Sequence, residues 1–113
     1  MDKLSEYRKI IQKLLTEYDC FYTIPSTEDS ENCLIFDEQR DQYLWMHMGW
    51  QKKQRCKGIT IHIRIKNEKI WIEEDWTEEG IATELLGAGV PQEDIVLAFY
   101  PPEERYLTEF AVA

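Results

Sequence analysis

Apolar residues recur at steps of three and four near the start of the chain. This spacing is typical of an amphipathic helix lying on a core, and it predicts a helix over about residues 2–18. The apolar stripe consists of Leu4, Tyr7, Ile11, Leu14, Leu15 and Tyr18. The next segment, 23–32, is polar, contains Pro25 and has no periodicity, so we expect a surface loop there.

The middle of the chain has the two-residue periodicity of β-strands. Strands are predicted at about 33–37, 42–50, 55–66 and 69–74. The clearest alternation sets Ile59, Ile61, Ile63 and Ile65 against Thr60, His62 and Arg64. The short connections at 51–54 and 67–68 predict two tight hairpins, and therefore an antiparallel meander.

The predicted strand register assigns side chains to two faces of the sheet. Facing residues have numbers that sum to 105 in the first hairpin and to 135 in the second. Leu44, Met46 and the isoleucines then share the face that packs on the helices. The other face carries our candidates for partner binding, because Trp, Tyr and Arg are enriched at interface centres. These candidates are Asp41, Tyr43, Trp45, His62, Arg64, Trp71 and Glu73.

The same face has alternative interpretations. It could equally be a ladder exposed to solvent, in which Arg64 stacks on Trp71 and His62 pairs with Glu73. It could also be covered by the C-terminal segment or by residues 20–32.

A second helix is predicted at about residues 77–88. Asp75 or Thr77 is the candidate N-cap, and the glycines near 87–89 with Pro91 beyond them end the helix. An extended segment and a short helical turn follow. Because both helices flank the sheet rather than alternate with its strands, we expect an α+β fold with the helices on one face, in a single domain over 1–113.

The net charge of −9 argues against sequence-independent DNA binding, which depends on basic side chains displacing counterions. The charge is unevenly distributed, however, because 52–69 holds seven Lys or Arg and one acid. One interpretation is that these charges neutralise others within the fold. The alternative is direct nucleic-acid binding by this basic hairpin, through Lys52, Lys53, Arg55 and Lys57.

Metal or catalytic chemistry has little support in the sequence. In the predicted register the two histidines lie about four residues apart along the sheet, and Met46 and Met48 point away from His47, so a soft-metal site is disfavoured. A metal-dependent hydrolase using Glu73, Glu74 or Asp75 is the less favoured alternative, since acids also stabilise a helix start. No catalytic motif occurs, and we expect no enzyme activity, cofactor or metal.

Cysteine usage and hydropathy bear on the compartment. Three cysteines without paired spacing, Cys20, Cys33 and Cys56, are expected to be reduced and mostly buried. No apolar run approaches the ~20 residues that span a bilayer. Both observations predict a cytoplasmic protein.

Five segments carry a resemblance to a known family: "MDKLSEYRKIIQKLLTEY", "DQYLWMHMGW", "IHIRIKNEKIWIEED", "TEEGIATELLGAGVPQEDIVLAF" and "PPEERYLTEFAVA". Together they resemble the XisI family, described as fdxN element excision controlling factors. "GVPQEDIVLAFYPP" and "TEFAVA" are the most specific, since neither composition nor periodicity demands them. The chain departs from the family at 46–48, where the family pattern is aliphatic-Asn-aliphatic.

The resemblance implies a small cytoplasmic protein of cyanobacteria and their relatives, needed with a recombinase and an XisH-like companion for programmed excision of a DNA element. It transfers no catalytic residue to this chain. The leading expectation is therefore a non-enzymatic accessory protein that binds the companion factor or itself.

Overall fold

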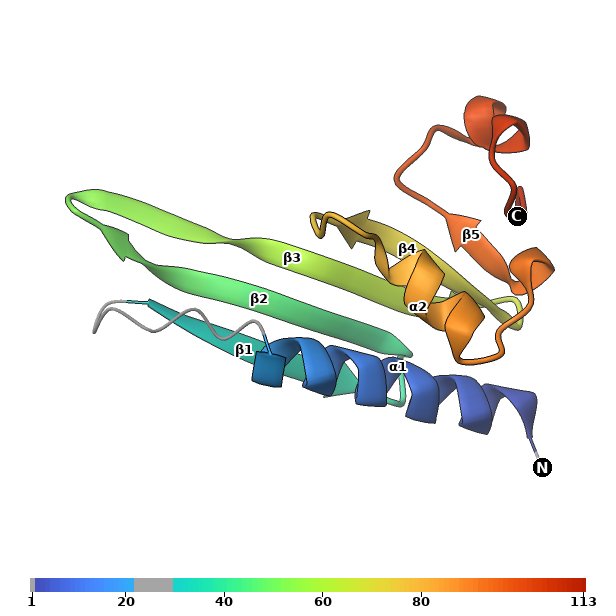
Figure 1. Ribbon diagram of the computed structural model, residues 1–113, viewed down its shortest axis with the longest axis horizontal. Coiled ribbons are helices and arrows are strands. Elements are labelled where there is room, and N and C mark those ends of the chain that lie inside the picture. The colour runs from blue at the N-terminus through green and yellow to red at the C-terminus, as the bar shows by residue number, and fades with distance from the viewer. Residues whose placement is uncertain (1, 22–29) are drawn as a thin grey trace.

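A five-stranded sheet with two helices on one of its faces forms the body of the protein in the computed structural model (Figure 1). The structure describes residues 2–21 and 30–113. The strands lie across the sheet in the order β1 (Ser30–Asp37), β2 (Gln42–Gln51), β3 (Gln54–Lys66), β4 (Lys69–Asp75) and β5 (Ile95–Leu97). The helices are α1 (Lys3–Phe21) and α2 (Ile81–Gly87), with the 3-10 helices η1 (Gln92–Asp94) and η2 (Pro102–Leu107). The predicted α+β class is confirmed.

Strands β1 to β4 form the predicted antiparallel meander, and β5 joins it parallel to β4. Asn67 and Glu68 close the β3–β4 hairpin with positive φ angles of 53° and 62°, as a two-residue turn requires. The sequence indicated a buried strand or an extended segment where β5 lies. Most of the loop expected at 23–32 lies outside the described residues, and β1 already begins at Ser30.

A β-bulge at Thr60 changes the register of the β2–β3 hairpin. Between Met46 and the turn, facing residues have numbers that sum to 105, as predicted; Met46, for example, faces Ile59. The next residue, Trp45, faces Ile61, so Thr60 is an extra residue in β3. A one-residue slip moves side chains to the opposite face of a strand. Tyr43 and Trp45 therefore face the core, and Ile59 does not, which reverses the predicted faces of these three residues.

A second bulge, at Glu73 in β4, directs the end of that strand towards α2. Between Ile63 and the turn, facing residues of β3 and β4 have numbers that sum to 135, as predicted. Further from the turn Ile61 faces Asp75, so β4 has one extra residue, Glu73. The Asp75 carboxylate accepts hydrogen bonds from the backbone N–H of Thr77 (2.9 Å) and of Ile81 (2.7 Å). The helix thus begins at Ile81 rather than at the predicted residue 77, because Asp75 holds the chain before it in a turn.

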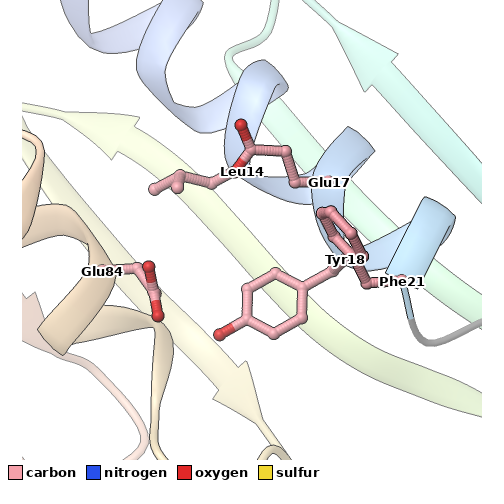
Figure 2. A pocket seen from close by; sticks show the side chains of 5 residues that line it. All are labelled: Leu14, Glu17, Tyr18, Phe21 and Glu84. Atoms are coloured by element: carbon pink, nitrogen blue, oxygen red, sulfur yellow. The ribbon is translucent and has the colours of Figure 1, made fainter.

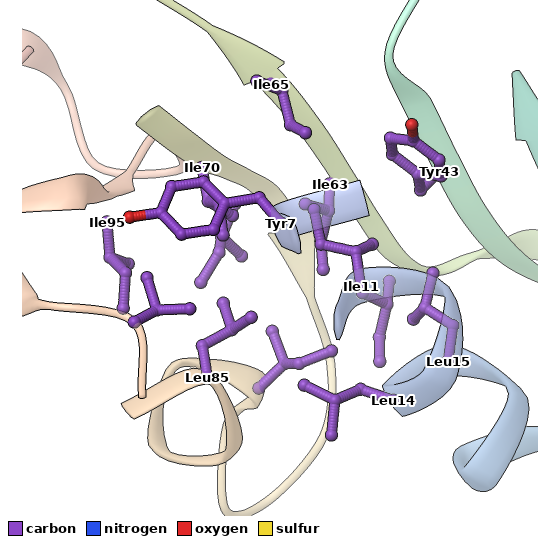
Figure 3. Close-up of a cluster of buried hydrophobic side chains, with 14 of the residues drawn as sticks. Tyr7, Ile11, Leu14, Leu15, Tyr43, Ile63, Ile65, Ile70, Leu85 and Ile95 are labelled. Atoms are coloured by element: carbon purple, nitrogen blue, oxygen red, sulfur yellow. The ribbon is translucent and has the colours of Figure 1, made fainter. Parts of the chain in front are cut away.

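The hydrophobic core lies between the two helices and the sheet (Figure 3). The predicted helix stripe faces this core as expected, with Ile11 and Leu15 fully inaccessible to solvent. Opposite them lie the core-facing side chains of the sheet, namely Tyr43, Trp45, Ile61, Ile63, Ile65, Ile70, Ile72 and Ile95. Leu85 of α2 closes the core at the other end of the helix layer.

An ion pair ties α1 to the β1–β2 turn. The Arg8 guanidinium donates to both Asp41 oxygens, at 2.7 and 3.2 Å, and the buried Tyr43 hydroxyl donates to Asp41 at 3.0 Å. Arg8 and the Tyr43 hydrogen bond together hold the pKa of Asp41 below its usual range. Asp41 is therefore a structural link between helix and sheet.

Asp94 makes a similar link between α1 and η1. Its carboxylate accepts a hydrogen bond from the Tyr7 hydroxyl and pairs with Lys3 at 2.9 Å. Burial acts to raise the pKa of Asp94, but Tyr7 and Lys3 outweigh burial and hold the pKa below its usual range. The first half of α1 is thus fixed by two shielded carboxylates as well as by apolar packing.

The cysteines are more exposed than the sequence suggested. Cys20 is exposed, and Cys33 and Cys56 are half-buried. The expectation of mostly buried cysteines is wrong, because Cys20 lies off the apolar stripe of α1 and Cys33 points away from the core. Among the described helices, none combines the length and apolar character needed to cross a bilayer.

The two carboxylates predict how stability depends on pH. A carboxyl whose pKa is lowered by folding stabilises the protein fully above its unfolded pKa of about 4, and this stabilisation is lost as the pH falls through the folded pKa. We expect Asp41→Asn and Asp94→Asn each to cost about 1–3 kcal/mol at pH 7 and progressively less below about pH 4. Urea unfolding across this pH range measures the effect, with the exposed Glu103→Gln as control. A pH-independent difference would contradict the role of the charge.

The bulge at Thr60 predicts unequal roles for two tryptophans on β2. Trp45 is 5% exposed, packs against Tyr18 and donates to Asp19, whereas Trp50 is 50% exposed. We expect Trp45→Ala to cost about 3–5 kcal/mol and Trp50→Ala less than about 1 kcal/mol. Denaturant unfolding of both variants tests this, and equal costs would refute the observed faces.

Candidate functional site

Trp71 lies on the face of the sheet opposite the helices, where the protein's own cations cover it. The guanidinium of Arg64, the ammonium of Lys66 and the guanidinium of Arg105 stand 5.6, 5.0 and 5.4 Å from the ring centre. The indole N–H donates to the Lys66 carbonyl, and only 6% of Trp71 is exposed. Stacking of Arg64 on Trp71 was one of the predicted alternatives, and it is observed.

The C-terminal segment supplies one of these cations and is fastened over the same end of the sheet. Arg105 donates to the carbonyls of Tyr100 (3.1 Å) and Ala98 (3.3 Å). Ala111 then returns to the sheet edge and bridges Val96. The C-terminal segment therefore covers Trp71, as one of the predicted alternatives for this face proposed.

His62 and Glu73 lie near Trp71 but have other partners than predicted. Arg64 pairs with Glu73 at 2.9 Å, and His62 bonds Gln42 at 2.8 Å. Burial lowers the pKa of His62, with Arg64 adding to the effect and Glu73 opposing it. The predicted pairing of His62 with Glu73 is replaced by these two contacts.

The structure divides the seven predicted candidates between the two faces. His62, Arg64, Trp71 and Glu73 are together on one face, as described. Asp41 sits in a turn against Arg8, while Tyr43 and Trp45 belong to the core on the other face. The expectation of one continuous aromatic surface is wrong, because the bulge at Thr60 separates Trp45 from Trp71.

Apolar side chains from three strands occupy the sheet face turned away from α1 and α2. We call this set the open face: Cys33, Ile35, Leu44, Met46, Met48 and Ile59. The register places Ile35 beside Leu44, and Met46 between Cys33 and Ile59. None of the six belongs to the hydrophobic core cluster, and Ile35 is 43% exposed. This surface was not predicted, because Leu44, Met46 and Ile59 were expected in the core.

The four basic residues suggested for nucleic-acid binding lie at the tip of the β2–β3 hairpin. This hairpin extends beyond both helices (Figure 1). The side chains of Lys52, Lys53, Arg55 and Lys57 are all exposed. Arg55 also stacks on Trp50, with 5.3 Å between its guanidinium carbon and the ring centre.

A pocket of about 600 Å³ opens on the helix side of the sheet, beside the last turns of α1. Its aromatic lining is Tyr18, Trp45 and Trp76. Its polar lining includes His47, Thr60, Glu78 and Glu79. His47 lies on this side of the sheet and bonds the Thr60 hydroxyl at 3.0 Å, so the two histidines are on opposite faces. No signal in the sequence pointed to this pocket, because Glu78 and Glu79 were expected in the first turn of a helix.

A smaller pocket of about 150 Å³ adjoins it between α1 and α2 (Figure 2). Tyr18 lines both pockets. In the smaller one Tyr18 and Glu84 point towards each other from the two helices, and Glu17 and Phe21 complete the wall. Neither pocket has a Lys or Arg among its described lining residues.

The carboxylates suggested for a hydrolase diverge. Glu73 pairs with Arg64, Glu74 accepts from the Trp76 indole at 2.6 Å, and Asp75 binds the start of α2. Within residues 2–21 and 30–113, no three His, Cys, Asp or Glu side chains converge on a position that could hold a metal ion. Each of the three acids has a structural partner.

Comparisons with known proteins identify relatives over the whole chain. The family described as XisI protein matches residues 1–112. The structure of the fdxN element excision controlling factor XisI from Anabaena variabilis ATCC 29413 is 47% identical, with a TM-score of 0.89, and the match covers 99% of this chain and 100% of that one.

A XisI-like protein from the same organism is 41% identical, with a TM-score of 0.91, and the match covers 97% of this chain and 99% of that one. No protein with a curated description matches this chain. The family match and both structures agree with the resemblance seen in the sequence, and this chain belongs to the XisI family.

Proposed function

We propose that this protein is a non-enzymatic controlling factor for the excision of a DNA element, and that it acts by binding an XisH-like companion protein. The observation that carries the proposal is the 47% identity to an fdxN element excision controlling factor over 99% of the chain. The acids suggested for a hydrolase all have structural partners, which favours a binding role over a catalytic one.

The open face is the surface we assign to the companion. Ile35, Leu44 and Met46 sit side by side across β1 and β2, on a face that the two helices leave uncovered. Arg64 and His62 border it on β3, and such a combination of an apolar centre with a polar rim is typical of protein interfaces. The predicted candidates His62 and Arg64 thus become rim residues in this proposal.

A double variant of the open face tests the companion interface. Ile35→Ser with Leu44→Ser removes two apolar side chains from its centre, and we expect the affinity for the XisH-like companion to fall by at least about tenfold, since few central residues carry most of the binding energy. Co-purification followed by titration calorimetry measures the decrease in affinity.

The matched control is Tyr106→Ser with Leu107→Ser, which removes two apolar side chains that are 72% and 71% exposed on η2. We expect the control to bind the companion as well as the wild type. Undiminished binding by the open-face variant would remove this surface from the proposal. A dimer of this chain alone that the same variant dissociates would instead assign the face to a second copy.

A second candidate function is direct nucleic-acid binding, and the projecting hairpin favours it. Residues 51–59 contain four cations and no acid, and the cations are all exposed at the tip. A protruding basic hairpin can reach phosphates without bringing the acidic body close.

Salt-dependent mobility shifts test the hairpin. We expect the wild type to bind duplex DNA weakly at low salt, and the slope of log affinity against log salt to decrease by about 1 for each phosphate that a variant no longer neutralises. The variant to compare replaces Lys52, Lys53, Arg55 and Lys57 by Gln. Absence of any wild-type complex at low salt would eliminate this function.

A further inference from the structure

The larger pocket combines aromatic walls with negative charge. Trp45 and Trp76 stand on its sheet and loop sides, Tyr18 comes from α1, and the carboxylates of Glu78 and Glu79 are at its exposed edge. Its volume of about 600 Å³ lies within the usual range of small-ligand sites, which is roughly 300–1,000 Å³.

The indole N–H groups are already engaged, which limits what the aromatic rings can offer a ligand. Trp45 donates to Asp19 at 3.1 Å, and Trp76 donates to Glu74 at 2.6 Å. The rings therefore present π-electrons rather than hydrogen-bond donors to the cavity. A ring face attracts cations and not anions.

The charged groups of the pocket also favour a cation. His47 and the Thr60 hydroxyl bond each other, whereas Glu78 and Glu79 provide carboxylate acceptors. The described lining has no Lys or Arg to neutralise them. A concave site lined by one sign of charge concentrates the opposite charge.

The neighbouring small pocket continues the same chemistry. It shares Tyr18 and adds the carboxylates of Glu17 and Glu84 beside the ring of Phe21 (Figure 2). The two pockets thus have the ring of Tyr18 in common, and each adds two carboxylates to its lining.

We propose that this pocket binds an organic cation of the guanidinium or alkylammonium type, held by the rings of Trp45 and Trp76 and by the carboxylates of Glu78 and Glu79. Two sources share this chemistry, a free small molecule and an Arg or Lys side chain of a peptide. The site is independent of the proposed companion interface, because the open face is on the other side of the sheet.

The four tryptophans provide an internal control for the test. In the ¹⁵N-labelled full chain, the indole N–H signals of Trp45 and Trp76 report on the pocket, while Trp50 and Trp71 are not among its described lining residues and report on other parts of the surface. We expect N-methylguanidinium to shift the first two signals saturably, with a dissociation constant on the order of 1 mM, and to leave the others unchanged. Sodium acetate at equal ionic strength should shift none of them.

Titration with peptides distinguishes a free organic cation from an Arg or Lys side chain as the ligand. An acetylated and amidated Gly-Arg-Gly peptide is compared with N-methylguanidinium and with the neutral Gly-Gln-Gly peptide. Binding of the Arg peptide at least about tenfold tighter than the small cation assigns the pocket to a protein side chain, and equal binding assigns it to a free organic cation.

Charge removal completes the test. Glu78→Gln with Glu79→Gln should weaken cation binding by about tenfold or more, whereas Glu103→Gln with Glu104→Gln, an equal change of charge on η2, should not. All four side chains are exposed, so the fold should tolerate both variants. Equal affinity in the two double variants, shifts that include Trp50 and Trp71, or saturable binding of acetate would each overturn the proposal.

Discussion

One extra residue in β3, at Thr60, sets which side chains of the long hairpin meet the helices. Strand β2 alternates strictly, so its pairing with β3 decides whether Tyr43 and Trp45 share a face with Ile61 and Ile63. With the bulge they do, and two aromatic rings join the core against α1. Without it these rings would lie outside the core, and Leu44, Met46 and Ile59 would face the helices instead.

The second bulge, at Glu73, has the matching effect on the other side of β3. It brings Asp75 to the helix side, where its carboxylate holds Thr77 and the start of α2. Bulges increase local twist and often lie next to binding sites. The larger pocket fits this pattern, because Thr60 belongs to its lining and the segment after Asp75 forms its outer wall.

The elements were predictable because their signals are local. The stripe of α1 and the turn at Asn67 and Glu68 follow from spacing and turn chemistry alone. Which side chains of β2 face the core was not predictable. The extra residue in β3 is Thr60, an ordinary strand residue, and not a glycine or another residue typical of a bulge. The cover over Trp71 was foreseen only as one of several alternatives, because Arg105 reaches the ring from a segment distant in sequence. The pocket likewise depends on where α2 begins, which Asp75 decides because the bulge in the pairing of β4 with β3 turns it to the helix side.

Charge is separated in space, and each surface therefore has its own chemistry. Strands β2 and β3 carry both the open face and, at their hairpin, the basic residues Lys52 and Lys53. A partner with an apolar surface next to acidic groups would therefore complement the open face and the hairpin tip together. The acids Glu78 and Glu79 lie on the opposite side of the sheet, beside the pocket. A cation in the pocket and a protein on the open face would therefore not compete for the same atoms.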